Sequence, residues 1–189
     1  LSGFAGDVLV LYGDTPLLEV ETLTALLDAR RSATAAAAVL GFRPADPGLY
    51  GRLVCDDSGK LERIVEARDA DAAILGLDLC NSGVMALDGG ALPGLLARLD
   101  NNNAKGEYYL TDIVAISAAD GRQSVVVEAT EESLLGVDNR ADLAVAEAVI
   151  QTRLRARAMA GGATLTDPAS TFLSHDTVLE QDGTVGPNV

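Results

Sequence analysis

Short apolar runs alternate along the chain with amphipathic helical patterns, and this alternation limits the fold more than any other feature. DVLVLYGD (7–14) is apolar until it ends on glycine and aspartate, which predicts a strand covered on both faces. VETLTALLDARR (20–31) carries leucines at the i, i+3 and i+4 spacing of an amphipathic helix. ATAAAAVLGF (33–42) has the alanine content of a helix, but its short length and the glycine and prolines around it favour a second central strand.

The rest of the chain continues this pattern. YGRLVCDDSGKLERIVEA (50–67) predicts a hairpin around the turn residues Asp-Ser-Gly. The other expected elements are strands at 81–87 and 123–129 and helices at 90–99, 107–119 and 139–160. Strands that alternate with helices predict an α/β fold with a Rossmann-like, mostly parallel sheet and flanking helices, and the inserted hairpin makes that sheet mixed.

Asp14 stands where the first expected strand ends and the chain must turn. Ligands of α/β sheets bind outside the carboxyl ends of the strands, so a carboxylate at this point is a candidate functional group. The alternative is structural, because aspartate is a good N-cap and a helix is expected soon after it. The segment alone leaves both interpretations open.

The acidic composition limits the classes of partner. The 189 residues carry a formal net charge of −14, and 48% of them are hydrophobic. This composition is ordinary for a globular protein and supports one domain with the beginning of a second. The charge argues against nucleic acids and anionic membranes as partners, because both require clustered Lys and Arg. An acidic protein that handles phosphates usually needs a divalent cation between the two.

No targeting segment is visible in the sequence. The chain starts at Leu1 without a basic stretch before an apolar core, and its most apolar segment is too short to span a bilayer. We therefore expect a cytoplasmic protein, and the missing initiator methionine suggests a piece of a longer one. Cys55 and Cys80 lack metal-ligand spacing and are expected to be ordinary thiols, while His175, the single histidine, is expected to be an ordinary surface residue.

The stretch NNNAKGEYYLTD (101–112) is the most distinctive in the chain. Asparagine can cap a helix and Glu107 suits a first helical turn, so a helix start explains part of the pattern. It does not explain three consecutive asparagines, which packing alone does not require. The stretch is therefore a candidate binding segment.

Six motifs together resemble those of a known family. They are LVLYGDTPLL, YGRLV, RIVEARDA, NSGV, NNNAKGEYYLTDIVA and GVDNR, in that order. With them the chain resembles the bifunctional N-acetylglucosamine-1-phosphate uridylyltransferase / glucosamine-1-phosphate N-acetyltransferase family of bacterial cell-wall precursor synthesis. The resemblance covers essentially all of the chain, including GATLTDPAST near its end.

The resemblance implies a nucleotidyltransferase sheet over residues 1–140, a linker helix over 141–161 and the start of a left-handed parallel β-helix over 162–189. A disordered tail is an equally open interpretation of the last segment. The implied reaction joins UTP and N-acetylglucosamine 1-phosphate into UDP-N-acetylglucosamine and pyrophosphate, with Mg²⁺ as cofactor. The full-length parent would also acetylate glucosamine 1-phosphate from acetyl-CoA and form a homotrimer.

The family's glycine-rich triphosphate loop is absent from this chain, so we expect the 189 residues alone to be inactive. Only the first turn of the trimerising β-helix is present, so we expect them to be mainly monomeric or to associate nonspecifically through an exposed sheet edge. Two alternatives remain open. One is a sugar-1-phosphate nucleotidyltransferase with a different base or sugar, because the missing segment reads the base. The other is a non-catalytic, trimerising scaffold.

The resemblance also implies roles for individual residues. Asp14 and Asp138 would be the catalytic metal ligands, with Asp138 standing where the family usually has asparagine, and Arg68 stands where many relatives have lysine. Glu66 could otherwise be a solvated strand residue, Gly51 a turn glycine and Thr111 a helix-interior hydroxyl. The implied substrate contacts are Tyr12 and Gly13 for the nucleotide, Gly51, Glu66 and Asn81 for the amino sugar, and Thr111 for phosphate.

Overall fold

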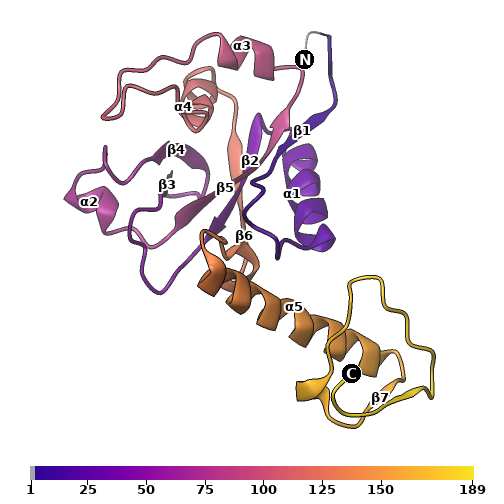
Figure 1. The fold of residues 1–189 in the computed structure, drawn as a ribbon. Helices are drawn as coiled ribbons and strands as arrows, with labels where there is room; N and C mark the ends of the chain where they lie inside the picture. Colours follow the sequence, from indigo (N-terminus) through magenta and orange to yellow (C-terminus); the bar gives the residue numbers. More distant parts are fainter. Residues whose placement is uncertain (1–2) are drawn as a thin grey trace. The chain divides into compact units, whose positions relative to one another are not determined.

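The computed structural model describes residues 3–189, which divide into two compact units, the first ending at Leu134 and the second comprising residues 135–189 (Figure 1). The first unit contains a sheet with flanking helices. The second consists of one long helix followed by a largely irregular segment.

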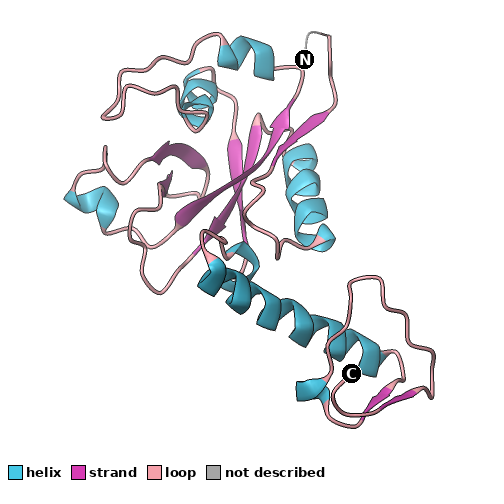
Figure 2. Cartoon of the chain, viewed as in Figure 1, coloured by secondary structure: helices cyan, strands magenta, loops and turns pink. Residues whose placement is uncertain are grey.

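The sheet of the first unit has six strands (Figure 2). In spatial order they are β1 (Asp7–Val10), β5 (Cys80–Asp88), β2 (Ala37–Phe42), β6 (Ser124–Glu128), β4 (Leu61–Val65) and β3 (Arg52–Cys55). The expected mixed α/β sheet is therefore confirmed.

Helices cover both faces of this sheet (Figure 1). α1 (Val20–Ser32) packs on one face together with the 3-10 helix η1 (Glu131–Leu134). α3 (Leu92–Leu96) and α4 (Asp112–Ala119) pack on the other face. The short helix α2 (Ala72–Leu75) joins β4 to β5 and was not expected from the sequence.

β2 is the centre of the first unit, because all of its residues are buried. Ala37 and Val39 contribute to the core cluster under α3 and α4. Ala38, Leu40 and Phe42 contribute to the cluster under α1. This alternation is the period of a strand with two apolar faces, so the strand interpretation of the alanine-rich run is confirmed over 37–42.

The expectation of a mostly parallel sheet needs correction. Among the described strands of this sheet, β2 and β6 form the one parallel pair, and the remaining pairings are antiparallel. β1 and β2 do run in the same direction and are linked by α1, as in a crossover unit. β5 lies between them in the opposite direction and converts two parallel neighbours into antiparallel pairs.

The first strand is shorter than expected. β1 ends at Val10, which pairs with Met85, and residues 11–14 are exposed. The apolar residues that follow Val10 therefore lie in a loop rather than in the sheet. The partner strand β5 leaves regular pairing at this level, so the backbone of β1 loses its ladder there.

The second unit begins with α5 (Arg140–Ala160), which confirms the expected long helix. After it, β7 (Thr164–Leu165) pairs in parallel with β8 (Thr184–Val185), and the 3-10 helix η2 (Pro168–Ser170) lies in the segment between them. A left-handed β-helix is not shown by these two short strands. In the part of the chain that the structure describes, no helix combines the length and apolar character needed to cross a membrane.

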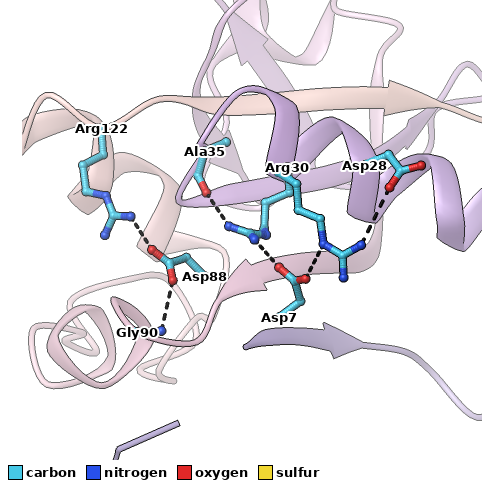
Figure 3. Close-up of polar contacts among 8 residues, drawn as sticks. Asp7, Asp28, Arg30, Ala35, Asp88, Gly90 and Arg122 are labelled. Atoms are coloured by element: carbon cyan, nitrogen blue, oxygen red, sulfur yellow. Dashed lines mark hydrogen bonds and ion pairs between the residues drawn. The ribbon is translucent and has the colours of Figure 1, made fainter. Parts of the chain in front are cut away.

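Charged side chains join the start of β1 to the end of α1 (Figure 3). Asp7 forms ion pairs with Arg30 and with Arg31, whose Nε lies 2.7 Å from Asp7 Oδ2. Asp88 is the register partner of Asp7 in β5 and accepts a hydrogen bond from Arg122. The ion pairs of Asp7 tie the edge strand β1 to the C-terminal end of α1.

The ion pair between Asp7 and Arg30 should contribute strongly to the free energy of unfolding of the first unit. Their side chains are only 13% and 15% exposed, so Asp7→Asn leaves a largely buried guanidinium without its counter-charge. We expect a loss of about 2–3 kcal/mol in the free energy of unfolding, somewhat less than for a fully buried pair. Asp28→Asn is the control, because Asp28 is 64% exposed and lies 3.8 Å from Arg31; it should cost less than about 0.5 kcal/mol. Urea unfolding measures both, and equal losses would contradict this assignment.

Candidate functional site

Asp14 does not cap the helix that follows it. α1 begins at Val20, and the residue at its N-cap position is Glu19. Asp14 is exposed in the loop after β1, and its carboxylate makes no hydrogen bond or ion pair within residues 3–189. The structural interpretation of this aspartate is therefore wrong, and its two oxygens are available to a ligand.

Gly51, Glu66 and Asn81 converge although they come from three different strand ends. A Cβ at Gly51 would lie 3.4 Å from Glu66 Oε1 and 3.6 Å from Asn81 Cβ. The Asn81 N–H donates to the Gly51 carbonyl oxygen at 2.8 Å. Gly51 has no positive φ, so backbone conformation does not require glycine there. The missing side chain instead leaves space between the carboxylate and the amide.

Thr111 extends this group on the side of Glu66. It occupies the N-cap position of α4 but makes no capping hydrogen bond. Its Oγ1 is buried and makes no hydrogen bond of regular geometry among the described residues, but it lies near the Glu66 carboxylate and lowers the pKa of that group. The Thr111 hydroxyl is therefore poorly satisfied within the protein and is free to reorient toward a ligand beside Glu66. The helix-interior interpretation of Thr111 is wrong.

A bulge in β5 divides its pairing with β2 into two parts. The strands pair at Val39–Met85 and again at Gly41–Asn81, so β5 uses residues 82–84 where β2 uses one residue. Extra residues in one strand bend it and turn side chains away from the regular ladder. The bulge thereby separates Asn81 from the core portion of β5.

Gly83 lies at the centre of the bulge and was not singled out from the sequence. Its φ is +84°, and a Cβ there would lie 2.4 Å from the Tyr12 ring. Its N–H donates to Asn81 Oδ1 at 3.0 Å. Gly83 thus connects Tyr12 to the group around Asn81. A glycine between polar residues inside an apolar strand was the available signal, because it often marks a bulge or a close contact.

The triple-asparagine stretch forms a loop rather than a helix start. Asn103 Oδ1 accepts hydrogen bonds from the N–H groups of Lys105 and Glu107, at 3.1 and 3.2 Å. Asp69 Oδ1 accepts from the Ala104 N–H at 2.8 Å, which ties this loop to the turn after Glu66. Because asparagine side chains satisfy the local backbone, α4 begins at Asp112, later than expected.

Glu66 lies in an electrostatically unfavourable environment for a carboxylate. Burial raises its pKa above the usual value, and the nearby carboxylates of Asp69 and Asp112 raise it further. Lys105 acts in the opposite direction and lowers the pKa. A carboxyl group of this kind gains stabilisation when a ligand supplies hydrogen-bond donors to its charged form.

The residues around the start of α5 differ in their availability. Asn139 Oδ1 accepts from the N–H groups of Ala141 and Asp142, and the Asp142 carboxylate accepts from the Asn139 N–H, which completes a capping box. The Asp138 carboxylate is exposed and makes no contact of this kind within residues 3–189. Asp138 is therefore the free oxygen donor of this motif, while Asn139 is committed to the helix.

The remaining predicted residues lie in open positions. Gly13 is exposed, with no atom within 4 Å of a hypothetical Cβ, and Arg68 is also exposed. Asp14 belongs to the first unit and Asp138 to the second. Within residues 3–189, no three side chains of His, Cys, Asp or Glu gather into a metal-binding group.

The cysteines and the histidine agree with expectation. Cys55 and Cys80 are free thiols, and burial raises the pKa of both. His175 is exposed. It lines a cavity of about 280 Å³ between α5 and residues 173–179 that is separate from the group around Gly51.

Comparisons with known proteins identify similar chains. The chain is 59% identical over 183 residues to the bifunctional protein GlmU of Rhodospirillum rubrum, which covers 96% of this chain and 41% of the relative. It is 55% identical over 190 residues to the bifunctional protein GlmU of Paramagnetospirillum magneticum, covering 100% and 42%. The chain thus spans about two fifths of the length of these relatives, and the resemblance found in the motifs is confirmed. No protein-family model matches the chain.

Among solved structures, CMP:2-keto-3-deoxy-manno-octonic acid synthetase complexed with CTP is similar to this chain. The TM-score is 0.54 at 16% identity, over 78% of this chain and 62% of the other. This likeness supports the fold alone, a mixed sheet flanked by helices.

Glu66→Gln should raise stability at neutral pH or leave it unchanged. Because the pKa of Glu66 is raised in the folded state, the folded protein keeps a proton that the unfolded chain loses, and the free energy of unfolding falls as pH rises from the usual glutamate pKa through the raised one. Glutamine does not titrate, so the free energy of unfolding of the variant does not fall in this way. The variant should therefore be more stable than the wild type at pH 7, and the difference should vanish below pH ~4. Urea unfolding from pH 4 to 7 measures it. Glu62→Gln, on the exposed side of β4, is the control for loss of a charge. A glutamine variant less stable than the wild type at pH 7 would contradict the assignment.

Proposed function

We propose that this chain forms part of a sugar-1-phosphate uridylyltransferase that makes UDP-N-acetylglucosamine and pyrophosphate from UTP and N-acetylglucosamine 1-phosphate. The premise is its similarity, at 59% and 55% identity over nearly its whole length, to proteins called bifunctional protein GlmU. The relatives are much longer than the chain, so the reaction of the complete gene product is inferred rather than read from these residues.

One observation carries the proposal. Residues from four separate segments meet around the space that Gly51 leaves free, with the carboxylate of Glu66 and the backbone of Asn81 in direct contact range. The buried Thr111 hydroxyl adjoins Glu66 without a hydrogen bond of regular geometry among the described residues. The site thus combines a carboxylate, an amide and a hydroxyl around a backbone that carries no side chain. This arrangement suits a ligand with several hydroxyl groups and a phosphate.

The chemistry of the chain's own residues in this reaction is mainly positioning. Glu66 accepts hydrogen bonds from sugar hydroxyls, and Asn81 binds the N-acetyl group or a neighbouring hydroxyl. Thr111 donates to the sugar phosphate and holds it for in-line attack on the α-phosphorus of UTP. Holding two reactants in attack geometry accounts for much of the acceleration of such transfers. Tyr12 and Gly13 would line the nucleotide side.

We also propose Mg²⁺ as cofactor, with Asp14 and Asp138 as its protein ligands. The donor chemistry fits, because both carboxylates are exposed, hard oxygen donors that no described residue engages. Mg²⁺ commonly takes one or two carboxylates and completes its shell with water and phosphate oxygens. When bound, the ion would neutralise phosphate charge, which otherwise would be repelled by a protein with a net charge of −14.

The domain assignments, the further partners and the localisation are proposals of the same kind. We propose that residues 1–140 form the uridylyltransferase portion, 141–161 a linker helix and 162–189 the start of an acetyltransferase β-helix. Acetyl-CoA and a homotrimer would belong to the full-length protein, in the bacterial cytoplasm, as part of cell-wall precursor synthesis.

The proposed function is tested by measuring pyrophosphate release from the complete gene product. UTP with N-acetylglucosamine 1-phosphate and Mg²⁺ should be the preferred combination, and EDTA should abolish the reaction. CTP, TTP, glucose 1-phosphate and glucosamine 1-phosphate are the comparison substrates. Preference for a different base or sugar would replace the proposal with the alternative nucleotidyltransferase, and no release with any pair would support a scaffold.

Gly51→Ala should weaken sugar binding without unfolding the protein. The added methyl group would lie 3.4 Å from Glu66 Oε1, an ordinary contact, and no positive φ opposes it, so stability should change by less than about 1 kcal/mol. In the sugar site the methyl group would occupy ligand space, so KM for N-acetylglucosamine 1-phosphate should rise roughly tenfold or more while KM for UTP stays unchanged. Steady-state kinetics with thermal unfolding separates the two effects. An unchanged KM for the sugar would place the sugar elsewhere.

Asp14→Asn should lower the rate of uridylyl transfer by roughly a hundredfold or more, the scale found when one electrostatic stabiliser is removed. Asp138→Asn restores the residue usual in the family and should leave the enzyme active, with a higher Mg²⁺ requirement because one ligand charge is lost. Both are measured in the complete gene product across a magnesium titration. Near-normal activity of Asp14→Asn at limiting magnesium would remove Asp14 from the site.

A further inference from the structure

Arg52 is a buried cation that nothing in the proposed reaction explains. It is the first residue of β3 and only 3% exposed. No carboxylate forms an ion pair with it among the described residues. Burying a charge is costly unless hydrogen bonds compensate for the lost water, so an arginine at this point needs a reason that packing does not supply.

The guanidinium group of Arg52 donates to the backbone of the loop that precedes it. Nη1 donates to the carbonyl oxygen of Pro47 at 3.2 Å and to that of Tyr50, and Nη2 donates to the carbonyl oxygen of Gly48 at 3.3 Å. The Nε–H is buried and has no partner within residues 3–189. Three carbonyl groups of one short loop thus converge on a single planar cation.

The same loop delivers Gly51 to the candidate site. Tyr50 packs its ring against Phe42 in an edge-to-face contact, with centroids 4.9 Å apart, and its N–H donates to the Pro47 carbonyl oxygen at 3.1 Å. Gly51 follows directly, and its carbonyl oxygen accepts from the Asn81 N–H. The backbone of Gly51 is therefore held on one side by β5 and on the other by a loop whose carbonyl groups Arg52 gathers.

We propose that Arg52 is a positioning residue for substrate binding, which sets the distance between the Gly51 backbone and the side chains of Glu66 and Asn81 on the sugar side of the site. This inference rests on the proposed uridylyltransferase function. The alternative is that Arg52 only stabilises the fold. Small displacements of a binding group can cost up to about a hundredfold in rate, so the two roles are separable by kinetics.

The test compares Arg52→Met and Arg52→Lys in the complete gene product. Methionine keeps much of the volume and removes all five donors, and lysine keeps the charge but cannot present a planar fork to three carbonyl groups. Arg52→Met should raise KM for N-acetylglucosamine 1-phosphate about tenfold, with KM for UTP within about twofold of the wild type, and Arg52→Lys should lie between the two.

Arg43→Met is the matched control. Arg43 begins the same loop segment, but its side chain is 47% exposed and forms ion pairs with Asp78 and Glu128. Removing this arginine should leave both KM values unchanged. If Arg43→Met shifts KM for the sugar phosphate as much as Arg52→Met does, the effect belongs to the segment in general, and the proposal fails.

The outcomes separate this inference from the proposed function. If the wild-type protein shows no uridylyl transfer, the proposed function fails before any variant is compared. If the wild type is active and Arg52→Met leaves KM for the sugar phosphate unchanged, or raises both KM values together, Arg52 is structural and the inference is overturned. Should the methionine variant be insoluble, the lysine variant decides by the same criterion, and titration calorimetry with N-acetylglucosamine 1-phosphate checks it independently of turnover.

Discussion

The first unit depends on a central strand that has no exposed face. Every residue of β2 is buried, and its side chains alternate between one core under α3 and α4 and another under α1. The run of alanines at its start keeps the side chains small, which allows the covering elements to approach the sheet closely. Because helices cover both faces of the strand, a ligand can reach it only at its ends. The candidate site accordingly lies at an end of the sheet, where β3, β4 and β5 begin or finish.

The environment of Glu66 disfavours the charged carboxylate, which is the form that would accept hydrogen bonds from a ligand. Glu66 is partly buried beside Asp69 and Asp112, and Lys105 offsets their effect only in part, so the charged carboxylate is disfavoured. Thr111 adds a buried hydroxyl that makes no hydrogen bond of regular geometry among the described residues. Such groups destabilise the protein by itself and become favourable when a polar ligand pairs with them. They are expected where selection has acted on binding rather than on stability. Arg52 extends this pattern, since it is a buried charge that organises a backbone segment beside the same residues.

The sequence predicted the long elements better than the pairing and the loops. β2, α1 and α5 follow from apolar periodicity, which depends on neighbours along the chain. The position of β5 between β1 and β2, antiparallel to both, does not follow from this periodicity. Strand pairing is a long-range property that the pattern of a single strand leaves open. The Asn103 loop was misassigned for a different reason. Asparagine satisfies the backbone equally well at a helix start and in a turn, and the contact with Asp69 that decides between them lies 35 residues away along the chain. Gly51, Glu66, Asn81 and Thr111 were identified by resemblance, and their convergence became visible only in three dimensions.

The bulge at residues 82–84 makes β5 a strand of two independent halves. Residues 85–88 are in register with β1, and 85–87 also with β2, while Asn81 and Cys80 pair with β2 on the other side of the irregularity. The hydroxyl of Ser82 donates to the Leu40 carbonyl oxygen at 2.6 Å, so the interruption is closed by its own side chain and leaves that ladder carbonyl satisfied. Cys80 returns to the core under α1, so the irregular residues are anchored by buried strand on both sides. Substitutions at Asn81 and within the bulge can therefore reshape the candidate site while both of its flanks hold their register.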